Sequence, residues 1–243
     1  MRPPGRRPDF RYTRLTQRCN HDPAQDLKGA LAPKVTHHRP AITEPAEFGK
    51  LLAAIHRYKG SHIVRSLLAL CPLLFQCPGE LLAMQWNELR LDEQEWHLPA
   101  DKMKMHNAHI VPLSNQAKAI LCDLRPLTGR CPYVFPSQGK RRTQHASNGT
   151  INKALQKMGV DTSTTHCAHG FRATARTLLD EQLGFRVEWI EHQLAHQVRD
   201  ALGRAYNRTT HLPQRRDMMQ RWADYLDELR LQAETGNVIT GHF

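Results

Sequence analysis

The chain lacks the features that direct proteins into membranes or oxidising compartments. Its most apolar stretch, Leu67 to Phe75, is interrupted by Pro72 and is far shorter than the roughly 20 residues needed to cross a bilayer. Residues 1–19 are rich in arginine and contain no apolar segment of the kind found in secretory signals. We therefore expect a cytoplasmic protein.

Closely paired cysteines are also missing. The six cysteines are scattered and none forms a CxxC pair: Cys19, Cys71, Cys77, Cys122, Cys131 and Cys167. In a chain of 243 residues this pattern predicts neither a disulfide framework nor a paired-cysteine metal site. Reduced thiols are expected instead.

Acidic residues are few relative to basic ones. The chain has 34 Lys and Arg against 23 Asp and Glu, for a formal net charge of +11. Such an excess favours polyanionic partners, with nucleic acid first and an anionic membrane surface second. Because no membrane span is present, nucleic acid is the expected partner.

The pattern along the chain predicts one main domain. Residues 1–40 carry many arginines and prolines with little apolar periodicity, so we expect a basic, mostly disordered segment. Residues 41–232 have the periodicity of a folded domain, and residues 233–243 read as a flexible C-terminal tail. No internal repeat is found.

The predicted fold class is mainly α with a small antiparallel β-sheet. Apolar spacing predicts helices near residues 43–57, 63–74, 80–86, 114–124, 151–158, 169–182, 186–194, 201–207 and 213–232. Between Trp96 and Pro112 the period approaches two, with the pairs Trp96/Leu98, Met103/Met105 and His109/Val111, which indicates short strands. Residues 126–139 and 140–148 read as loops.

Four residues near the C-terminal end form a set suited to attack on a phosphodiester. They are His169 and Arg172 in His169-Gly170-Phe171-Arg172, then His196, then Tyr206. A tyrosine hydroxyl is a poor nucleophile at neutral pH, because its pKa lies near 10. Cations around the hydroxyl and the phosphate can activate it. In a basic chain, this set suggests phosphoryl transfer on nucleic acid.

Each of these residues also has an ordinary structural interpretation. His169 and Arg172 share one face of a predicted helix, and such pairs are most often structural. His196 suits a hydrogen-bonded helix end, and Tyr206 suits a half-buried aromatic position. Only their occurrence together, in this order, favours chemistry.

Several longer segments resemble the catalytic domain of the tyrosine recombinases, and more narrowly that of phage and genomic-island integrases. The resemblance is carried by HGFR (169–172), QLAH (193–196), RAYNR (204–208), WNEL (86–89) and IVPLS (110–114). It extends almost continuously from Asn20 to about Leu229, which makes it far more specific than any one short motif. It implies the DNA breaking-rejoining fold and site-specific DNA recombination.

The resemblance also implies a role for each site residue. Tyr206 matches the nucleophile that forms a 3′-phosphotyrosine link, and Arg172 and His169 match the pair that stabilises the pentacoordinate phosphorane. His196 matches a further phosphate donor, and Lys104 matches the lysine that protonates the leaving 5′-oxygen. No metal and no cofactor are implied. Taken alone, Lys104 and its neighbour Lys102 would read as solvated residues of a turn.

One position departs from the family pattern. Where the family has an arginine before a Pro-Gly-Glu-Leu turn, this chain has Cys77. A thiol has neither the donor fork nor the fixed charge of a guanidinium. Losing one preorganised donor costs on the order of 10²–10³ in rate. Arg65 and Arg90 lie nearby in sequence, but neither occupies the turn.

The second departure concerns the N-terminal part. Family members carry DNA-binding domains before the catalytic one, and only the end of a core-binding domain is recognisable here, at about residues 20–34. Together with Cys77 this predicts a truncated and impaired recombinase. The implied partner is double-stranded DNA at attachment sites, with a possible tetramer on DNA and a monomer in solution.

Two other functions remain open at this point. A non-catalytic DNA-binding remnant would share the basic surface and the fold. A zinc enzyme is suggested by the spacing of His192 and His196 and by the cluster His166, Cys167 and His169. Against zinc, the chain has no HExxH motif.

Overall fold

The computed structural model describes residues 16–18, 39–103, 107–137, 143–196 and 211–236. The chain divides into a unit of residues 1–38 and a unit of residues 39–243, and the elements below belong to the second. The helix predicted at 201–207 lies outside the described residues.

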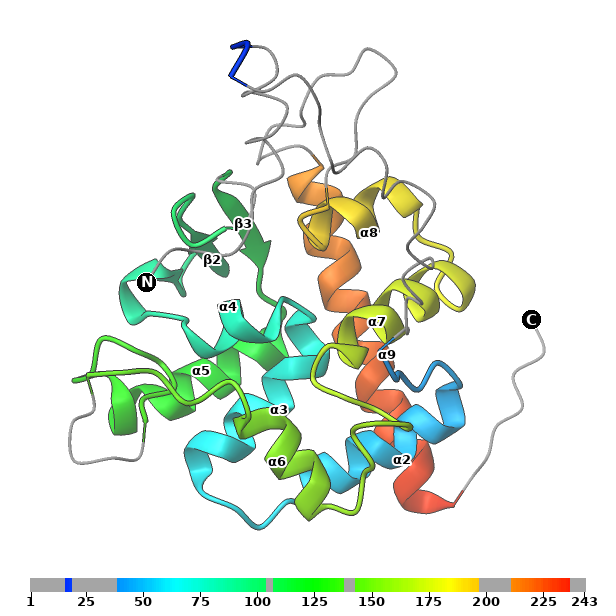
Figure 1. Ribbon diagram of the computed structural model, residues 1–243. Coiled ribbons are helices and arrows are strands. Elements are labelled where there is room, and N and C mark those ends of the chain that lie inside the picture. The colour runs from blue at the N-terminus through cyan, green and yellow to red at the C-terminus, as the bar shows by residue number, and fades with distance from the viewer. Residues whose placement is uncertain (1–15, 19–38, 104–106, 138–142, 197–210, 237–243) are drawn as a thin grey trace. The chain divides into compact units, whose positions relative to one another are not determined.

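The described elements are mostly helices (Figure 1). They are α2 (Pro45–His56), α3 (His62–Leu74), α4 (Pro78–Leu82), the 3₁₀ turn η1 (Trp86–Glu88), α5 (Asn115–Thr128), α6 (Thr150–Lys157), α7 (Gly170–Glu181), α8 (Val187–Gln193) and α9 (Leu212–Thr235). With one small sheet beside them, they confirm the predicted fold class. None of the described helices has the length and apolarity that a membrane crossing requires.

The sheet has three short antiparallel strands in the order β1 (Leu89–Arg90), β2 (Glu95–Leu98) and β3 (His109–Pro112). Leu89 lies opposite Trp96, and Glu95 lies opposite Pro112. The alternating patterns at 96–98 and 109–111 therefore predicted β2 and β3 correctly. β1 was missed because a two-residue strand is too short to show alternation.

The strand inferred from the spacing of Met103 and Met105 was wrong at Met103. The N–H of Met103 donates to the Ala100 carbonyl at 3.2 Å, and the N–H of Lys102 donates to the Pro99 carbonyl at 3.2 Å. These i to i+3 bonds close a turn after Pro99. Met105 lies outside the described residues.

Two helices run further than expected. α5 continues through Pro126 to Thr128, since one proline removes a single N–H donor and the Thr128 hydroxyl donates to the Val134 carbonyl at 3.0 Å. α9 runs to Thr235, beyond the expected end at 232. In both helices tertiary packing extends the element past its local sequence signal.

The core is built where α3 and α9 meet the other helices. α9 packs along α2, where Gly49 allows close approach, because a Cβ there would lie 2.6 Å from the Leu229 carbonyl oxygen. Trp222 of α9 is fully buried and donates its indole N–H to the Pro72 carbonyl at 2.9 Å. This carbonyl lies in the last turn of α3, where carbonyls have no partner within the helix.

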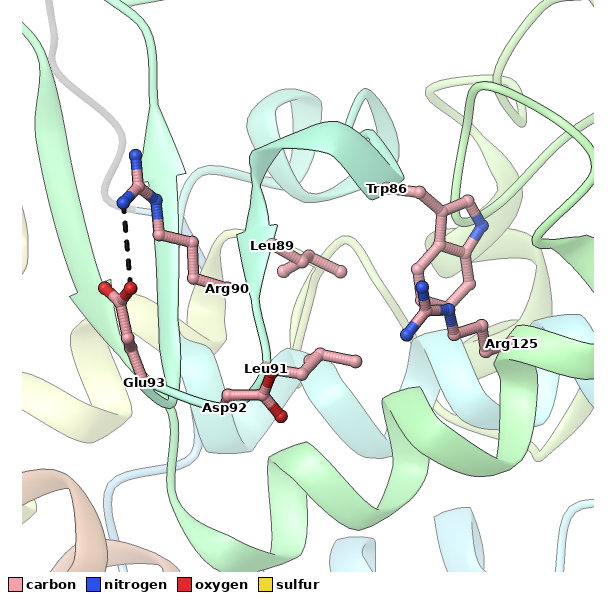
Figure 2. Close-up of a pocket in the computed structure, with 7 residues that line it drawn as sticks. All are labelled: Trp86, Leu89, Arg90, Leu91, Asp92, Glu93 and Arg125. Atoms are coloured by element: carbon pink, nitrogen blue, oxygen red, sulfur yellow. Dashed lines mark ion pairs between the residues drawn. The ribbon is translucent and has the colours of Figure 1, made fainter.

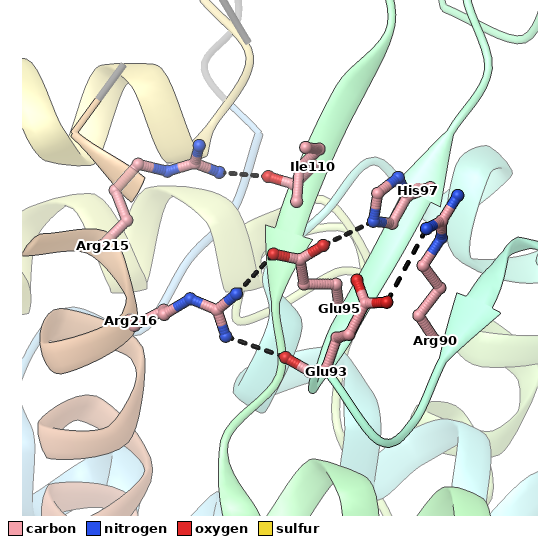
Figure 3. A network of polar contacts seen from close by, with 7 residues as sticks. All are labelled: Arg90, Glu93, Glu95, His97, Ile110, Arg215 and Arg216. Carbon is pink, nitrogen blue, oxygen red and sulfur yellow. Dashed lines mark hydrogen bonds and ion pairs between the residues drawn. The ribbon is translucent and has the colours of Figure 1, made fainter. Parts of the chain in front are cut away.

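A buried arginine joins the start of α9 to the sheet. Arg215 is 0% exposed, and its guanidinium donates to the Gln193 side-chain oxygen at 2.6 and 2.9 Å and to the Ile110 carbonyl at 2.5 Å. Figure 3 shows Arg215 reaching from α9 to β3. Burial lowers the pKa of Arg215 to about 9, which still leaves it charged at neutral pH.

The next residue of α9 makes a second bridge to the sheet. Arg216 pairs with the buried Glu95 and donates to the Glu93 carbonyl at 2.8 Å, while His97 contacts the other oxygen of Glu95 at 2.5 Å (Figure 3). The two arginines fix the N-terminal end of α9 against β2 and β3.

Replacing Arg215 by alanine should destabilise the fold strongly. The Arg215→Ala change leaves the Gln193 and Ile110 oxygens without their donor, so we expect the unfolding free energy to fall by about 3 kcal/mol or more. The matched control is Arg90→Ala, which removes an exposed ion pair with Glu93 at 3.7 Å and should change stability by about 1 kcal/mol or less. Urea unfolding of both variants tests this, and equal losses would contradict it.

Candidate functional site

Arg172 is the centre of the candidate site. It lies in the first turn of α7, and its guanidinium donates to the Phe75 carbonyl at 3.2 Å and to the Leu194 carbonyl at 2.7 Å. These carbonyls belong to the ends of α3 and α8. Three segments distant in sequence are therefore joined through one side chain.

The backbone at Phe75 is arranged for this contact. Phe75 follows α3 with φ of 39°, a left-handed conformation that is uncommon for a bulky residue. Its ring is fully buried and packs edge-on against Trp222, with ring centroids 6.1 Å apart. The turn ends α3 at the point where the Phe75 carbonyl meets Arg172.

His196 is held on both sides of its ring. Its Nδ1 lies 2.5 Å from the Glu191 carboxylate, and its Nε2 lies 3.3 Å from the Arg172 guanidinium. Because a guanidinium can only donate, Nε2 must accept and Nδ1 must carry the hydrogen that Glu191 accepts. Arg176 donates to the other Glu191 oxygen at 2.8 Å. Burial works to raise the pKa of Glu191, but the hydrogen bonds from His196 and Arg176 outweigh it and leave that pKa below its ordinary value.

His169 has the opposite kind of partner. Its Nδ1 lies 2.7 Å from the guanidinium of Arg39, so Nδ1 is the acceptor. Partial burial, together with the charges of Arg39 and Arg172, lowers the pKa of His169. His169 is thus neutral at neutral pH, with its hydrogen on Nε2.

The segment that carries Arg39 is bound to the start of α7. The Pro40 carbonyl accepts from the N–H of Cys167 at 3.2 Å, and the Ile42 carbonyl accepts from the Thr174 hydroxyl at 2.6 Å. A Cβ on Gly170 would lie 2.6 Å from the Pro40 carbonyl oxygen. The close approach therefore requires glycine at 170.

His166 supports the same segment from the core. Its Nδ1 accepts from the N–H of Ile42 at 3.1 Å, and its ring packs edge-on against Phe171, with centroids 4.4 Å apart. Burial lowers the pKa of His166 to about 4. It is a neutral structural histidine.

Cys77 lies beside Arg172, at the turn into α4. The carboxylate of Glu80 accepts from the N–H of Cys77 at 3.3 Å. Burial raises the pKa of Glu80, against the opposing effects of Arg172 and the Cys77 N–H. Burial also lowers the pKa of Arg172, while Cys77, Glu80 and Glu191 raise it. The turn brings a thiol to the pocket and no guanidinium.

Gln193 connects the site to the buried arginine of α9. Its carbonyl accepts from the Gln76 side chain at 2.9 Å and from His109 Nε2 at 3.2 Å, and its side chain accepts from Arg215. Burial and the charge of Arg215 lower the pKa of His109 to about 3, so His109 is a neutral donor. This network fixes the residue next to Leu194, whose carbonyl holds Arg172.

Lys104 and Tyr206 lie outside the described residues. Lys102 is described, and it does not solvate a turn. It pairs with the buried Glu88 and donates to the Ala83 carbonyl at 3.0 Å, which anchors the loop after β2.

The arginines near Cys77 in sequence have other partners. Arg65 contacts Nδ1 of His62 at 3.0 Å, and Arg90 lies 3.7 Å from Glu93. Figure 2 shows Arg90 and Glu93 on a groove of about 430 Å³ that Arg125 and Trp86 also line. None of the residues that line this groove is a predicted site residue.

The zinc groupings suggested by the sequence do not assemble. Within the described ranges, the only set of three His, Cys, Asp or Glu side chains with ligand atoms within 4.8 Å of one another is Glu93, Glu95 and His97. His97 contacts the Glu95 carboxylate, and Arg216 pairs with the same carboxylate. This trio is a charge-neutralised contact between the sheet and α9.

The sequence motifs predicted His169, Arg172 and His196 as site residues but did not predict the residues that contact them. The structure brings these three together through Arg172. Glu191, Gln193 and Arg39 were not found because acidic, amide and basic side chains carry no distinctive spacing. The Glu191–His196 separation of five residues was the one local signal available.

The Phage integrase family model matches residues 42–211. The chain belongs to this family. The integrase of Enterobacteria phage P4 is 37% identical over 231 residues, covering 90% of this chain and 52% of that relative. Prophage integrase IntA of Escherichia coli (strain K12) is 33% identical over 231 residues, covering 95% of this chain and 54% of the relative. The integrase chain spans about half the length of these relatives.

Solved structures show the same fold. A lambda integrase dimer bound to a COC′ core site superposes with a TM-score of 0.57 at 17% identity, covering 82% of this chain and 71% of that one. The integrase from mycobacterium phage Brujita gives 0.54 at 16% identity, covering 92% and 72%. The tyrosine recombinase catalytic fold expected from the sequence motifs is confirmed.

Acid should destabilise this integrase domain partly through His166. The folded pKa of about 4 lies below the ordinary 6.5, so the unfolded chain binds more protons between these values. The contribution is complete above pH 6.5 and is lost as pH falls towards 4, by on the order of 3 kcal/mol. In His166→Asn the amide oxygen can still accept from Ile42 but does not titrate. Urea unfolding across this range should show a shallower acid loss in the variant; identical slopes would refute the assignment.

Gly170 should be sensitive to a single added methyl group. In Gly170→Ala the Pro40 segment must shift, and we expect a loss of about 1–3 kcal/mol of unfolding free energy. Gly79 is the matched control, since a Cβ there meets nothing within 4 Å. Gly79→Ala should leave stability unchanged or raise it by about 0.5–1 kcal/mol. Thermal unfolding distinguishes the two, and a Gly170→Ala protein as stable as the control would contradict the close contact.

Proposed function

We propose that this integrase chain cleaves and rejoins double-stranded DNA at attachment sites of a prophage or genomic island. The supporting observation is that His169 and Arg172, at the start of α7, lie near His196, after α8, and that main-chain carbonyls at the ends of α3 and α8 hold Arg172. Arg172 and the Nε2–H of His169 offer donors to the non-bridging oxygens of one phosphate, and His196 supports Arg172. DNA as partner also agrees with the net charge of +11.

The proposed reaction needs no metal. The Tyr206 hydroxyl loses its proton to water and its oxygen attacks the phosphorus, the bond from phosphorus to the 5′-oxygen breaks, and a 3′-phosphotyrosine link forms. Lys104 donates the proton that the leaving 5′-oxygen takes up. Arg172 and the Nε2–H of His169 stabilise the added negative charge of the phosphorane. Rejoining reverses these steps, with the 5′-hydroxyl as the nucleophile.

Cys77 should impair the reaction. The turn places a thiol beside Arg172, where the family pattern has a second fork of donors. Loss of such a donor costs on the order of 10²–10³ in rate. A non-catalytic DNA-binding protein is the second candidate function, and this substitution is the observation that favours it. We expect a monomer in solution and a tetramer on DNA.

A nicked suicide substrate tests the proposal. Cleavage should trap a covalent protein–DNA adduct that forms slowly in the unaltered chain and about 10²–10³ times faster in Cys77→Arg. Tyr206→Phe should form none in either background. The readout is the adduct band on a denaturing gel over time.

Binding measurements complete the design. Salt-dependent DNA binding without any adduct, even in Cys77→Arg, would establish the non-catalytic function. An adduct that persists in Tyr206→Phe would overturn the assignment of the nucleophile. An adduct in the unaltered chain that Cys77→Arg does not accelerate would overturn the explanation of the defect.

A further inference from the structure

Arg39 is a second guanidinium at the candidate site. It precedes α2 by several residues and is remote in sequence from the turn at Cys77. Its guanidinium nevertheless lies 2.7 Å from His169 Nδ1. Within the described residues no other hydrogen-bond partner of the His169 ring is found.

We propose that Arg39 is a positioning residue, which holds His169 as a neutral imidazole with Nε2–H as the hydrogen-bond donor offered to the phosphate. The tautomer of His169 is inferred from its contact with Arg39. That its Nε2–H meets a phosphate rests on the proposed function. A guanidinium has five donors and no acceptor, so the ring nitrogen that it contacts cannot carry a hydrogen. The one remaining hydrogen of a neutral ring is then on Nε2.

The two site histidines are consequently fixed as opposite tautomers. His196 places Nδ1 against the Glu191 carboxylate and so carries its hydrogen there, whereas His169 places Nδ1 against Arg39. Arg172 reinforces the difference, since it donates to His196 Nε2 and acts on His169 as a nearby positive charge. His169 is therefore ready to donate through Nε2 without a change of protonation.

The main chain gives Arg39 little freedom to move away. The next residue, Pro40, is tied to Cys167, and Ile42 is tied to His166 and to Thr174. His166 and Thr174 are both fully buried. The backbone beside Arg39 is thus fixed to the segment that carries His169, so the fold itself holds the two side chains close together.

Charge near His169 comes from each element packed around it. Partial burial disfavours the protonated ring most, followed by the charges of Arg39 and Arg172. Arg39 precedes α2, and Arg172 lies on α7. Glu80 and Glu191 act on Arg172, and the Glu191 carboxylate contacts the other site imidazole, that of His196. Removing Arg39 therefore takes away the direct partner of His169 and one of its two neighbouring positive charges.

The first measurement requires no DNA. Nitrogen-15 NMR of histidine-labelled protein reports the tautomer and the pKa of each ring, and His169→Asn identifies the His169 signals by their loss. In Arg39→Ala we expect the pKa of His169 to rise and its Nδ1–H tautomer to become populated. Arg39→Lys should restore much of the original state, because an ammonium also only donates. Arg57→Ala, which removes an exposed cation after α2, should change neither.

The second measurement follows adduct formation against pH in the Cys77→Arg background. Arg39→Ala should slow the adduct roughly tenfold or more near neutral pH, the scale seen when the outer partner of a metal-binding histidine is removed. It should also shift the pH profile with the His169 pKa. Arg39→Lys should recover most of the rate, and Arg57→Ala should match the parent.

The two measurements separate the failure of this inference from failure of the proposed function. An unchanged His169 titration in Arg39→Ala overturns the positioning role, whatever the DNA assay shows. A changed titration with an unchanged adduct rate and pH profile overturns its part in the reaction. If no variant forms an adduct, the recombinase function fails, while the NMR result still decides whether Arg39 fixes the tautomer.

Discussion

The site depends on satisfying one partly buried guanidinium. A charged group removed from water needs hydrogen-bond acceptors, and Arg172 obtains two of them from the main-chain carbonyls of Phe75 and Leu194. Main-chain acceptors move only if their segments move. Arg172 therefore fixes the left-handed turn at Phe75 and the end of α8 against α7. The same guanidinium contacts His196, which follows α8, and so positions its ring.

The support extends well beyond the residues that would meet a phosphate. Gln193 accepts from Gln76 and His109 with its main chain and from Arg215 with its side chain, which ties the end of α8 to the turn before α4, to β3 and to α9. Buried polar networks of this kind favour one arrangement, because a partly broken network leaves donors without acceptors. The position of the Leu194 carbonyl is thus determined by α9, which contributes no predicted site residue.

Local patterns in the sequence predicted most of the described helices and two of the three strands, although α4 covers Pro78–Leu82 where a helix at 80–86 was expected. They failed where geometry is decided by tertiary contacts: at the two-residue β1, at Met103, and at the extended ends of α5 and α9. The site followed the same rule. His169, Arg172 and His196 stand in recognisable motifs, but Glu191, Gln193 and Arg39 act through contacts that spacing does not encode. Arg39 is 130 residues from the histidine that it contacts.

Among the described residues, no arginine near Cys77 in sequence lies free to take the place of the arginine that the family pattern has at position 77. Sequence neighbours of the turn, Arg65 and Arg90, are engaged with His62 and Glu93. A cation in contact with His169 comes instead from the segment before α2. The Arg39 guanidinium donates to His169 and does not lie at the turn where the family pattern has an arginine, so its role is a different one. In the proposed reaction the site then keeps Arg172 to bind the phosphate and His169 with its hydrogen on Nε2, without the arginine that the family pattern has at position 77. Preorganisation can therefore survive in a site whose transition-state stabilisation is reduced, and the two properties must be measured separately.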